Sequence, residues 1–471
     1  MGDEFFFLPL GGAEEIGMNL NLYGIDSKWL MVDLGVSFGE DRLPGIDVVM
    51  PDPSYIEARR DNLLGLVLTH GHEDHLGAVQ YLWPRLRCPI YATPFTASLL
   101  RAKLMENNFE NDVPIHELSL GARFNLGPFD LEFITVTHSI PEPNALVIRT
   151  RLGTVLHTGD FKIDPSPLVG SEVDENALRK VGDEGVLAMV CDSTNVFESK
   201  ESGSEGELRD SLEKIVAGRI GRVAVTTFAS NFARIKTAAS IAVKNDRQPV
   251  LVGRSLRRIL SVARESSYGR ELPEFVSEHD ASYLPPDKVL LICTGSQGET
   301  REAMARIADG SHPHVSLESG DLAIFSSKII PGNEKPISRL HNQLINIGVE
   351  VITEKEKFVH VSGHPSRSEL ARMYSWVRPT VAIPVHGERR HIHEHVKFAR
   401  SLQISESVEV MNGGLVRLAP GPAKVVDHVC SGYLAADGNR VVDVKSDFFR
   451  ERRRLMFNGM VNVVLVLNNN N

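Results

Sequence analysis

The chain has 471 residues, of which 42% are hydrophobic and 24% are charged, and its formal net charge at pH 7 is −10. This composition is typical of a globular protein and excludes a disordered or collagen-like chain. At about 100–200 residues per domain, the length predicts two to four domains. The four cysteines include no C-x-x-C pair, which excludes a disulfide scaffold or a thiolate zinc site and is typical of a reducing compartment.

The first residues, MGDEFFFLPLGG, lack the basic region of a signal peptide, and no apolar run approaches the roughly 20 residues of a membrane span. We therefore expect a soluble cytoplasmic protein with no membrane contact. The first 165 or so residues are expected to form short strands with few helices, because their apolar runs are short and bounded by Gly, Pro, Asn or Asp. These strands are predicted at residues 5–10, 19–25, 29–34, 66–69, 89–92, 130–137 and 145–150.

From about Ser204 the pattern changes to alternating helices and strands, which predicts a mostly parallel sheet. Ser204 and Glu207 have the spacing of a capping box at the start of the first helix. Strands are expected at 223–227, 249–252, 289–293, 322–326, 358–361 and 381–385, and helices at 232–243, 256–265, 299–308, 337–347, 369–377 and 389–402. The chain closes with a basic run at 450–454 and the apolar sequence MVNVVLVL, which we expect to be a strand.

The positive charge of the chain is concentrated in one segment. Residues 219–264 hold ten basic side chains and one acidic side chain, so this segment carries +9 and the rest of the chain −19. Helix faces that only contact solvent usually carry charges of both signs, whereas this segment is almost entirely basic. We therefore favour the interpretation that it forms a binding surface for an anionic polymer over the alternative of solvent-exposed helix faces. The bases are Arg219, Arg222, Arg234, Lys236, Lys244, Arg247, Arg254, Arg257, Arg258 and Arg264.

The strongest chemical signal is the sequence THGHEDH at residues 69–75, directly after a short apolar run. His70, His72, His75 and the carboxylate of Asp74 are ligands suited to Zn²⁺ or Mn²⁺. A strand that ends in a tight turn brings them into a small volume, where two sets of ligands can hold two metals about 3.5–4 Å apart. A lone histidine is more often structural, but three histidines and an aspartate within six residues indicate a metal site.

The HxHxDH pattern resembles the hallmark of the metallo-β-lactamase superfamily. This resemblance implies an α/β fold, an αββα sandwich, with a dinuclear metal site at one sheet edge. It also implies further ligands downstream, which are His138 in VTHSIP and Asp160 in HTGDF, each at the end of a strand, with Asp160 bridging both metals. Asp33 in MVDLG matches the early aspartate of the superfamily and would support the site, with a plain turn residue as the alternative.

Residues 194–354 resemble the β-CASP domain of the nucleic-acid-processing members. Asp192 in DSTN, His364 in SGHPS and His386 in PVHGE match its acidic, central histidine and final histidine motifs. The strings HSIPEP, GDFKID, TTFASN, TGSQGE and HVSGH resemble the bacterial ribonuclease J family over nearly the whole chain. The expected domains are 1–193 and 355–420 for the metallo-β-lactamase domain, 194–354 for the inserted β-CASP domain, and 421–471 for a linker and the start of a truncated C-terminal domain.

The resemblance implies a metal-dependent ribonuclease with 5′–3′ exonuclease and endonuclease activity on single-stranded RNA, in RNA maturation and decay. We expect two divalent ions per chain, with Zn²⁺ preferred over Mn²⁺. One ion would be held by His70, His72 and His138, the other by Asp74, His75 and His386, with Asp160 between them. Asp74 would also orient the attacking water, and His364, steered by Asp192, would contact the scissile phosphate or protonate the leaving 3′ oxygen.

Two loops are expected to bind phosphates of the RNA. Ser230 and Asn231 head a helix in the basic segment and would bind one phosphate. A second loop opens the helix at 369–377, and its backbone N–H groups would cradle a 5′-monophosphate end. That loop comprises His360, Val361, Ser362, Gly363, His364 and Ser366. We also expect a homo-oligomer, a dimer or a tetramer, that a missing C-terminal part would weaken.

Three other functions stay open at this point. A β-CASP DNA nuclease would share the metal site, because no residue type identifies a sensor of the 2′-hydroxyl. A small-molecule hydrolase would not need the inserted basic segment, and a catalytically inactive RNA-binding paralogue would have lost a ligand, whereas all seven are present. The sequence HIHEH at 391–395 is expected to be a polar helix beside the site, since an HExxH motif would need histidine in place of Lys397.

Overall fold

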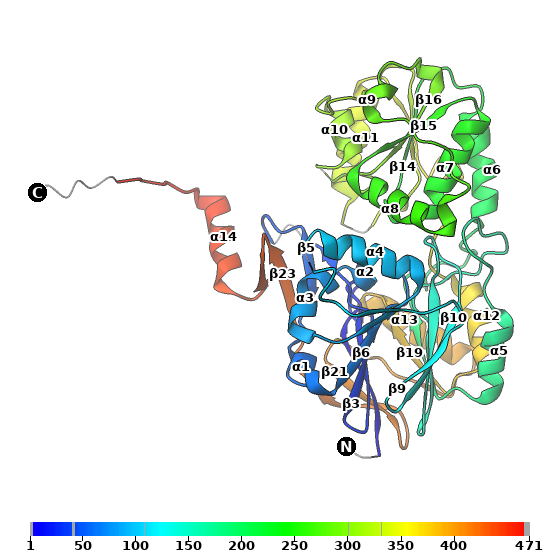
Figure 1. The fold of residues 1–471 in the computed structure, drawn as a ribbon, viewed down its shortest axis with the longest axis vertical. Coiled ribbons are helices and arrows are strands. Elements are labelled where there is room, and N and C mark those ends of the chain that lie inside the picture. The colour runs from blue at the N-terminus through cyan, green and yellow to red at the C-terminus, as the bar shows by residue number, and fades with distance from the viewer. Residues whose placement is uncertain (1–2, 40–42, 108, 300, 331, 466–471) are drawn as a thin grey trace, which may run out of the picture.

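The computed structural model describes residues 3–39, 43–107, 109–299, 301–330 and 332–465. They form two α/β bodies, one with two facing sheets and one with a single five-stranded sheet, and a helix near the C-terminus projects from the first body (Figure 1). The predicted class, an αββα sandwich with an inserted α/β domain, is confirmed.

The first sheet of the sandwich contains the N-terminal strands. Its order is β22 (Lys424–His428), β21 (Gly414–Ala419), β1 (Phe5–Gly11), β2 (Leu20–Ile25), β3 (Lys28–Val32), β6 (Leu63–Val67), β7 (Ile90–Ala92) and β8 (Ile115–Glu117). Side chains alternate along a strand, so Phe5 and Phe7 enter the core between the two sheets, while Phe6 and Leu8 enter the core under the helices. Helices α1 (Ser54–Glu57), α2 (Glu73–Leu76), α3 (Val79–Leu86) and α4 (Pro94–Met105) lie on this outer side, with the short turn η1 (Arg60–Asn62).

The second sheet carries the later strand ends that build the site. Its order is β20 (Glu406–Ser407), β19 (Val381–Val385), β13 (Ala188–Asp192), β12 (Gly153–His157), β11 (Asn144–Thr150), β10 (Phe129–Thr135) and β9 (Arg123–Leu126). Helices α5 (Glu175–Glu184), α12 (Arg367–Val377) and α13 (Arg389–Ser401) cover its outer face (Figure 1). Because β12, β13 and β19 run parallel, their carboxyl ends meet at one edge.

The inserted body is a parallel sheet with helices on both faces, as the alternating pattern predicts. Its strand order is β15 (Gln248–Val252), β16 (Val289–Cys293), β14 (Val223–Thr226), β17 (Leu322–Phe325) and β18 (Glu350–Ile352). One face packs on α6 (Glu205–Val216), α7 (Phe232–Lys244) and α8 (Arg254–Glu265), and the other on α9 (Glu278–Ala281), α10 (Ala303–Ala308) and α11 (Glu334–Asn346). Two short turns, η2 (Ser267–Gly269) and η3 (Pro286–Lys288), complete this body.

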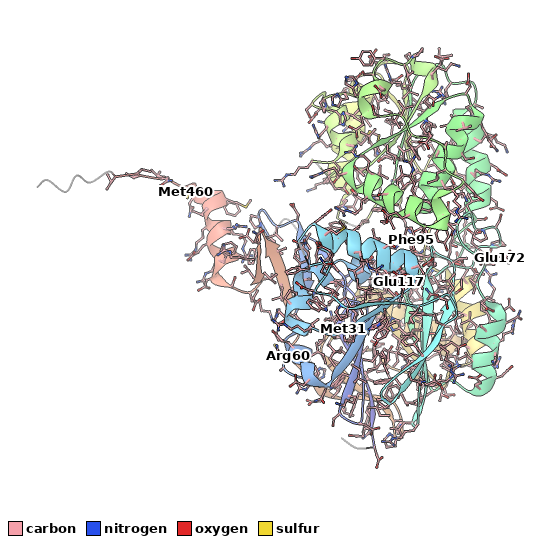
Figure 2. All side chains as sticks on the ribbon, viewed as in Figure 1. Met31, Arg60, Phe95, Glu117, Glu172 and Met460 are labelled. Carbon is pink, nitrogen blue, oxygen red and sulfur yellow. The ribbon has the colours of Figure 1, made fainter. Side chains whose placement is uncertain are left out.

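The two bodies meet where α4 lies below α8. Phe95, at the start of α4, is labelled at this boundary in Figure 2. Its ring centroid lies 6.2 Å from that of Phe232 and 5.9 Å from that of Tyr268, both in the inserted body. At the other end of α4, Glu106 forms an ion pair with Arg258 of α8. Apolar and charged contacts therefore both join the bodies here.

The last part of the described chain returns to the first body. A four-stranded sheet has the order β24 (Arg440–Asp443), β23 (Tyr433–Asp437), β5 (Val48–Pro51) and β4 (Ser37–Phe38). Helix α14 (Asp447–Asn458), which carries the basic run, then points away from it, and Met460 lies beyond the helix (Figure 2). None of the helices in the described part of the chain has both the length and the apolar character needed to cross a bilayer.

Several predicted elements are wrong. The expected strand at 358–361 is an irregular loop, because the carbonyl of Val359 accepts hydrogen bonds from the Ser326 and Arg234 side chains and none of the described strands pairs with this segment. Ser204 caps α6 by accepting from the N–H of Gly206 (3.2 Å), but Glu207 does not complete a box. Among the described elements with no predicted counterpart are helices α3, α4, α5 and α14 and strands β5, β8, β9 and β21–β24.

The remaining element boundaries differ by a few residues, and two differences matter. The helix expected at 299–308 begins only at Ala303, and residue 300 lies outside the described residues. The strand expected from MVNVVLVL is absent over 460–465, where the chain is exposed and unpaired, and residues 466–471 lie outside the described part. The domain boundaries stay a prediction.

Candidate metal centre and substrate site

The predicted ligands lie at the carboxyl ends of strands from both sheets of the sandwich. The loop after β6 and the short helix α2 carry His70, His72, Asp74 and His75, while His138, Asp160 and His386 follow β10, β12 and β19. Ligand atoms of these seven residues gather into two groups, and Asp160 belongs to both. The structure therefore brings together every residue that the sequence analysis proposed as a ligand.

Three imidazole nitrogens face one another in the first group. His72 Nδ1 lies 3.1 Å from His70 Nε2 and 2.9 Å from His138 Nε2. Burial lowers the pKa of all three histidines, to about 4 for His72, so they are neutral at pH 7. His138 donates its Nδ1 proton to the carbonyl oxygen of Gly363 at 2.5 Å, which leaves its Nε2 lone pair directed at the group. Lone pairs that converge in this way fit a divalent cation between them.

The second group consists of Asp74, His75, His386 and the shared Asp160. His75 Nε2 lies 3.1 Å from Asp160 Oδ2, and His386 Nε2 lies 3.1 Å from Asp74 Oδ2. Burial acts to lower the pKa of both histidines, but the surrounding carboxylates outweigh it and hold both pKa values well above the usual one. Burial acts to raise the pKa of Asp74 and Asp160, and the histidines outweigh it, so both carboxylates stay ionised. Such a group fits a second divalent metal, whose binding would release the histidine protons.

Asp33 holds His75 in place. Its Oδ2 accepts the Nδ1 proton of His75 at 2.7 Å, and its Oδ1 accepts the N–H of Thr69 at 2.8 Å. Asp33 is fully buried and has a φ of 62°, in the left-handed region. Its carboxylate fixes the His75 tautomer whose Nε2 faces the second group, which is the arrangement expected of a residue that supports a metal ligand.

Sequence reasoning missed two polar residues that position the ligands. Asn19 Nδ2 donates to the carbonyl of Asp74 at 3.1 Å and lies 3.2 Å from His75 Nε2. Thr194 Oγ1 donates to Asp192 Oδ1 at 2.7 Å and lies 2.9 Å from His386 Nδ1. Thr194 lies in the quoted DSTN string, which is a usable signal, whereas Asn19 lies far from every motif.

Asp192 and His364 form an ion pair beside both groups. His364 Nδ1 lies 2.8 Å from Asp192 Oδ2 and 3.8 Å from Asp160 Oδ2. Burial acts to lower the pKa of His364, but Asp192 and then Asp160 outweigh it and raise the pKa above its usual value. The side chain of His364 is 22% exposed, so its cationic ring can reach a bound anion.

The loop at 360–366 lies against the first metal group. A Cβ atom on Gly363 would lie 2.6 Å from His138 Cε1, so only glycine allows this approach. Ser362 Oγ accepts hydrogen bonds from Asn195 Nδ2 (2.7 Å) and from the N–H of His364 (3.1 Å). Phosphate binding by this loop remains a prediction.

Three residues of the loop have structural contacts of their own. Val361 is buried in the core under the helices. Burial and then the charge of Arg234 lower the pKa of His360 to about 3, so its ring is neutral. Ser366 caps α12 in a full capping box, in which its own N–H donates to Glu369 Oε2 at 2.8 Å and is therefore occupied.

The other predicted phosphate site is the start of α7. Asn231 caps this helix by accepting the N–H of Arg234 at 2.9 Å, and the N–H of Ala233 donates to the carbonyl of Ser139, next to His138, at 3.3 Å. The helix start thus lies beside the metal groups, and the roles of Ser230 and Asn231 stay a prediction. In the sequence HIHEH, both ring nitrogens of His395 bond protein hydroxyls, Ser193 Oγ at 2.9 Å and Tyr374 OH at 3.0 Å.

The basic segment does not form one continuous surface. Arg234 and Arg247 are buried and bond protein groups, Arg234 the carboxylate of Glu205 and Arg247 backbone carbonyls. Five other bases pair with acids outside the cavity described next: Arg219, Arg222, Lys236, Lys244 and Arg264. These acidic partners lie outside the segment in sequence. The net charge counted over residues 219–264 therefore overestimates the number of basic side chains that are free to bind a ligand.

The remaining three bases of the segment line a cavity of about 1220 Å³ between α4 and α8. These are Arg254, Arg257 and Arg258, and the lining also includes Arg101, Arg301 and Arg306. Acidic residues line the cavity too, among them Glu106 and Glu278, which pair with Arg258 and Arg257. Six guanidinium groups against these acids give the cavity a basic character suited to phosphates.

Comparisons with known proteins agree with this site. The chain matches family models for the metallo-beta-lactamase superfamily over residues 19–225, the ribonuclease J beta-CASP domain over 220–344 and the Zn-dependent metallo-hydrolase RNA specificity domain over 348–405. A protein named Ribonuclease J from Sinorhizobium meliloti is 47% identical over 469 residues, which cover 99% of this chain and 83% of that protein. This chain belongs to the ribonuclease J family.

Other ribonuclease J family members are more distant. Ribonuclease J 1 of Streptococcus pyogenes is 38% identical, with 99% of this chain and 84% of that protein covered. Ribonuclease J of Corynebacterium glutamicum is 38% identical, with 98% of this chain but 64% of that protein covered. A solved structure of a protein of unknown function from Enterococcus faecalis V583 has the same fold, with a TM-score of 0.62 at 16% identity, covering 88% of this chain and 100% of that one.

Proposed function

We propose that this chain is a metal-dependent ribonuclease that hydrolyses phosphodiester bonds of single-stranded RNA, both from the 5′ end and internally. The observation that carries the proposal is the convergence of His70 Nε2, His72 Nδ1 and His138 Nε2 beside a second group that shares Asp160, in a member of the ribonuclease J family. A DNA nuclease, a small-molecule hydrolase and an inactive paralogue are not favoured by the family relationship or by the intact ligand set.

The residues divide between two metal positions. We propose that His70, His72 and His138 hold one ion, that Asp74, His75 and His386 hold the other, and that Asp160 lies between them. Two divalent cations bound there, which we take to be Zn²⁺ with Mn²⁺ as the alternative, would lower the pKa of a water molecule and offset the charge that builds on the phosphate. Asp74, at 30% side-chain exposure, is the open carboxylate of the second group and would orient the water for attack.

The Asp192–His364 pair supplies the proton. Since Asp192 holds Nδ1 of His364 at 2.8 Å and the pKa of the ring is raised, the proton on Nε2 is available near neutral pH. His364 would donate it to a phosphate oxygen or to the leaving 3′ oxygen. The carboxylate of Asp192 keeps the His364 ring oriented and offsets the positive charge of the protonated ring until the proton is donated.

The 5′ preference follows from the loop at 360–366. In this loop the N–H groups of Ser362, His364 and Ser366 already donate to protein groups. The N–H of Gly363, next to His364, would donate to the phosphate, and the carbonyl of Gly363 accepts from His138 Nδ1. A terminal monophosphate held there would place the first linkage over the metal groups. We further propose a cytoplasmic homo-oligomer whose chain has a metallo-β-lactamase domain at 1–193 and 355–420 and a β-CASP domain at 194–354.

The test compares three substrates. Purified protein is incubated with 5′-monophosphorylated RNA, the matched DNA and nitrocefin, with and without a chelator. We expect cleavage of the RNA alone, its loss with chelator and its return on adding Zn²⁺ or Mn²⁺. Faster cleavage of the DNA, or hydrolysis of nitrocefin, would contradict the proposal, and so would RNA cleavage that survives full metal removal.

A further inference from the structure

The carboxylate of Glu369 lies fully buried in the first turn of α12 and accepts four hydrogen bonds. Its Oε1 accepts from the N–H of Ile163 (2.8 Å) and the hydroxyl of Ser202 (2.7 Å). Its Oε2 accepts from the N–H of Ser202 (3.1 Å) and the N–H of Ser366 (2.8 Å). All four donors are neutral. A buried carboxylate is costly unless its lone pairs are satisfied, so this geometry is kept only while the three donor residues stay in place.

The three donor residues belong to different working parts of the molecule. Ile163 lies three residues after Asp160, on the loop that carries the shared metal ligand. Ser202 lies in the segment between β13 and α6, through which the chain enters the inserted body. Ser366 ends the loop that carries Ser362 and His364. One carboxylate therefore joins the metal loop, the connection between the two bodies and the proposed phosphate loop.

A second buried chain of contacts runs parallel to the first. Lys162 Nζ lies 2.8 Å from Asp164 Oδ2, and the same oxygen accepts the N–H of Glu205 at 2.9 Å. The Glu205 carboxylate pairs with the buried Arg234 at 3.3 Å. Arg234 in turn donates to the carbonyl of Val359, which precedes the phosphate loop, at 3.5 Å. This chain links the same two loops through the inserted body, so their spacing is fixed from two sides.

We propose that Glu369 is a positioning residue that sets the spacing between the Asp160 loop and the loop of Ser362 and His364. This inference rests on the proposed function, because the spacing matters only where a phosphate held by one loop must reach metals held by the other. Misplacement of reacting groups by about 1 Å can cost about a hundredfold in rate, even when the change lies far from the chemistry. Glu369 touches neither metal ligand nor substrate, so its effect is on geometry.

The variant Glu369→Gln tests this role. One acceptor oxygen becomes an NH₂ group that faces at least one backbone N–H, so at least one of the four hydrogen bonds is lost and two donors are left opposite each other. With 5′-monophosphorylated RNA we expect kcat to fall by more than about tenfold with KM changed by less than about threefold. Hydrolysis of bis-p-nitrophenyl phosphate should fall by less than about threefold on the same scale, because this substrate has no terminal phosphate for the loop to hold and its leaving group needs no proton from His364.

Two further variants make the result decisive. Leu344→Ala removes a buried side chain of α11, far from both loops, and controls for loss of stability alone. Ser202→Ala removes one donor from Glu369 while leaving the carboxylate, and should lower kcat on RNA in the same direction but less, which keeps the test available where Glu369→Gln does not fold. Hydrogen exchange should quicken together at residues 160–166, 200–204 and 362–368 in the Glu369 and Ser202 variants and not in Leu344→Ala.

Each other outcome overturns a specific statement. RNA turnover in Glu369→Gln within about twofold of the wild type, or parallel losses on both substrates like those of Leu344→Ala, would overturn the positioning role. A wild-type protein that fails to cleave RNA would overturn the proposed function instead. In that case hydrogen exchange still tests Glu369: rates at 160–166, 200–204 and 362–368 that are the same in Glu369→Gln as in the wild type would show that Glu369 does not hold these segments in place.

Discussion

His138 and Gly363 lie 225 residues apart in the chain and are in direct contact at the centre of the site. The imidazole Nδ1 of His138 donates to the carbonyl of Gly363 at 2.5 Å, and a Cβ on Gly363 would lie 2.6 Å from the ring. This contact sets the tautomer of a proposed metal ligand from within the proposed phosphate loop. The proposed metal site and the proposed phosphate loop are therefore joined by one hydrogen bond.

Replacing Gly363 by alanine should break that coupling. A Cβ at 2.6 Å from a ring atom forces either His138 or the loop to move, so we expect lower metal content and a loss of RNA cleavage of about tenfold or more, the scale of disturbing a partner of a metal ligand. Gly432→Ala is the matched control, because its Cβ would meet nothing nearer than 3.9 Å. Equal metal content and activity in Gly363→Ala and Gly432→Ala would contradict the contact.

The second metal group should depend on Asp74. Metal analysis is expected to find about two ions per wild-type chain, as for a two-metal site. Asp74→Ala should retain about one, and its turnover should fall by more than about a hundredfold, since even outer partners of metal ligands are worth 10–100-fold. The fold should persist, because the Asp74 side chain in the short helix α2 is 30% exposed and belongs to no hydrophobic core. Glu73→Gln, at the neighbouring position, serves as the control, and full activity of Asp74→Ala at wild-type metal content would contradict the mechanism.

The phosphate loop should make cleavage depend on the 5′ end. RNA with a 5′-monophosphate should be degraded faster than the same RNA with a 5′-triphosphate or a cap, because a bulkier end does not fit a pocket sized for one phosphate. Ser362→Ala removes the hydroxyl that bonds Asn195 and the N–H of His364, and should reduce that preference. Ser375→Ala, on the exposed side of α12, should leave it unchanged. Equal rates on all three ends in the wild type would rule out the pocket.

The arginines of the α4–α8 cavity should control the salt dependence of RNA binding. Each phosphate contact on a single strand contributes a slope of about −0.7 in log affinity against log salt, so three to five contacts predict about −2 to −3.5. Replacing Arg254, Arg257 and Arg258 with glutamine should make this slope less steep by about 2, at about 0.7 per contact. It should also weaken the binding of all RNA sequences to the same extent. Hydrolysis of bis-p-nitrophenyl phosphate should not change.

A matched triple variant distinguishes the cavity from charge in general. Arg219, Lys244 and Arg264 belong to the same segment but pair with acids outside the cavity, so neutralising them should alter the slope much less. A wild-type slope near zero, or equal effects of the two triple variants, would show that the cavity is only a solvated surface.

Glu142 should make stability depend on pH. Burial raises its pKa above the usual 4.5, while its carboxylate accepts the N–H of Phe95 at 2.8 Å. The folded state then binds the proton more tightly than the unfolded chain does, so this residue's contribution to stability is complete below pH 4.5 and is lost as pH rises through the folded pKa. As the pH rises from 4.5 through the folded pKa of Glu142, the free energy of unfolding of the wild type should fall relative to that of Glu142→Gln. Urea unfolding at several pH values measures this difference. A constant difference would contradict the shifted pKa.

The amino-acid sequence, with the family that its motifs resemble, predicted the fold class, and the residues that it proposes as ligands are the ones that the structure brings together. Metal ligands such as those at 70–75 follow short apolar strands at fixed spacing, and a strand end places neighbouring side chains together whatever the rest of the chain does. The alternating helices and strands of the inserted body are also predicted from neighbouring residues alone. Their signals are the hydrophobic periodicity within each element and the Gly and Asn residues where elements end. These features need no knowledge of distant contacts.

Tertiary structure alone decided which polar groups are free. The ten bases at 219–264 look like one surface, but seven are buried or paired away from the cavity. The other three face the cavity, where Arg257 and Arg258 also pair with acids. The apolar run at 358–361 reads as a strand, yet the carbonyl of Val359 accepts from side chains of the inserted body, and no described strand pairs with this run. Glu369 resembles any helix residue until Ile163 and Ser202 are seen to donate to it. The reason is common to all three: hydrogen bonds and ion pairs are satisfied in space, by groups whose distance along the chain leaves no trace in the local pattern.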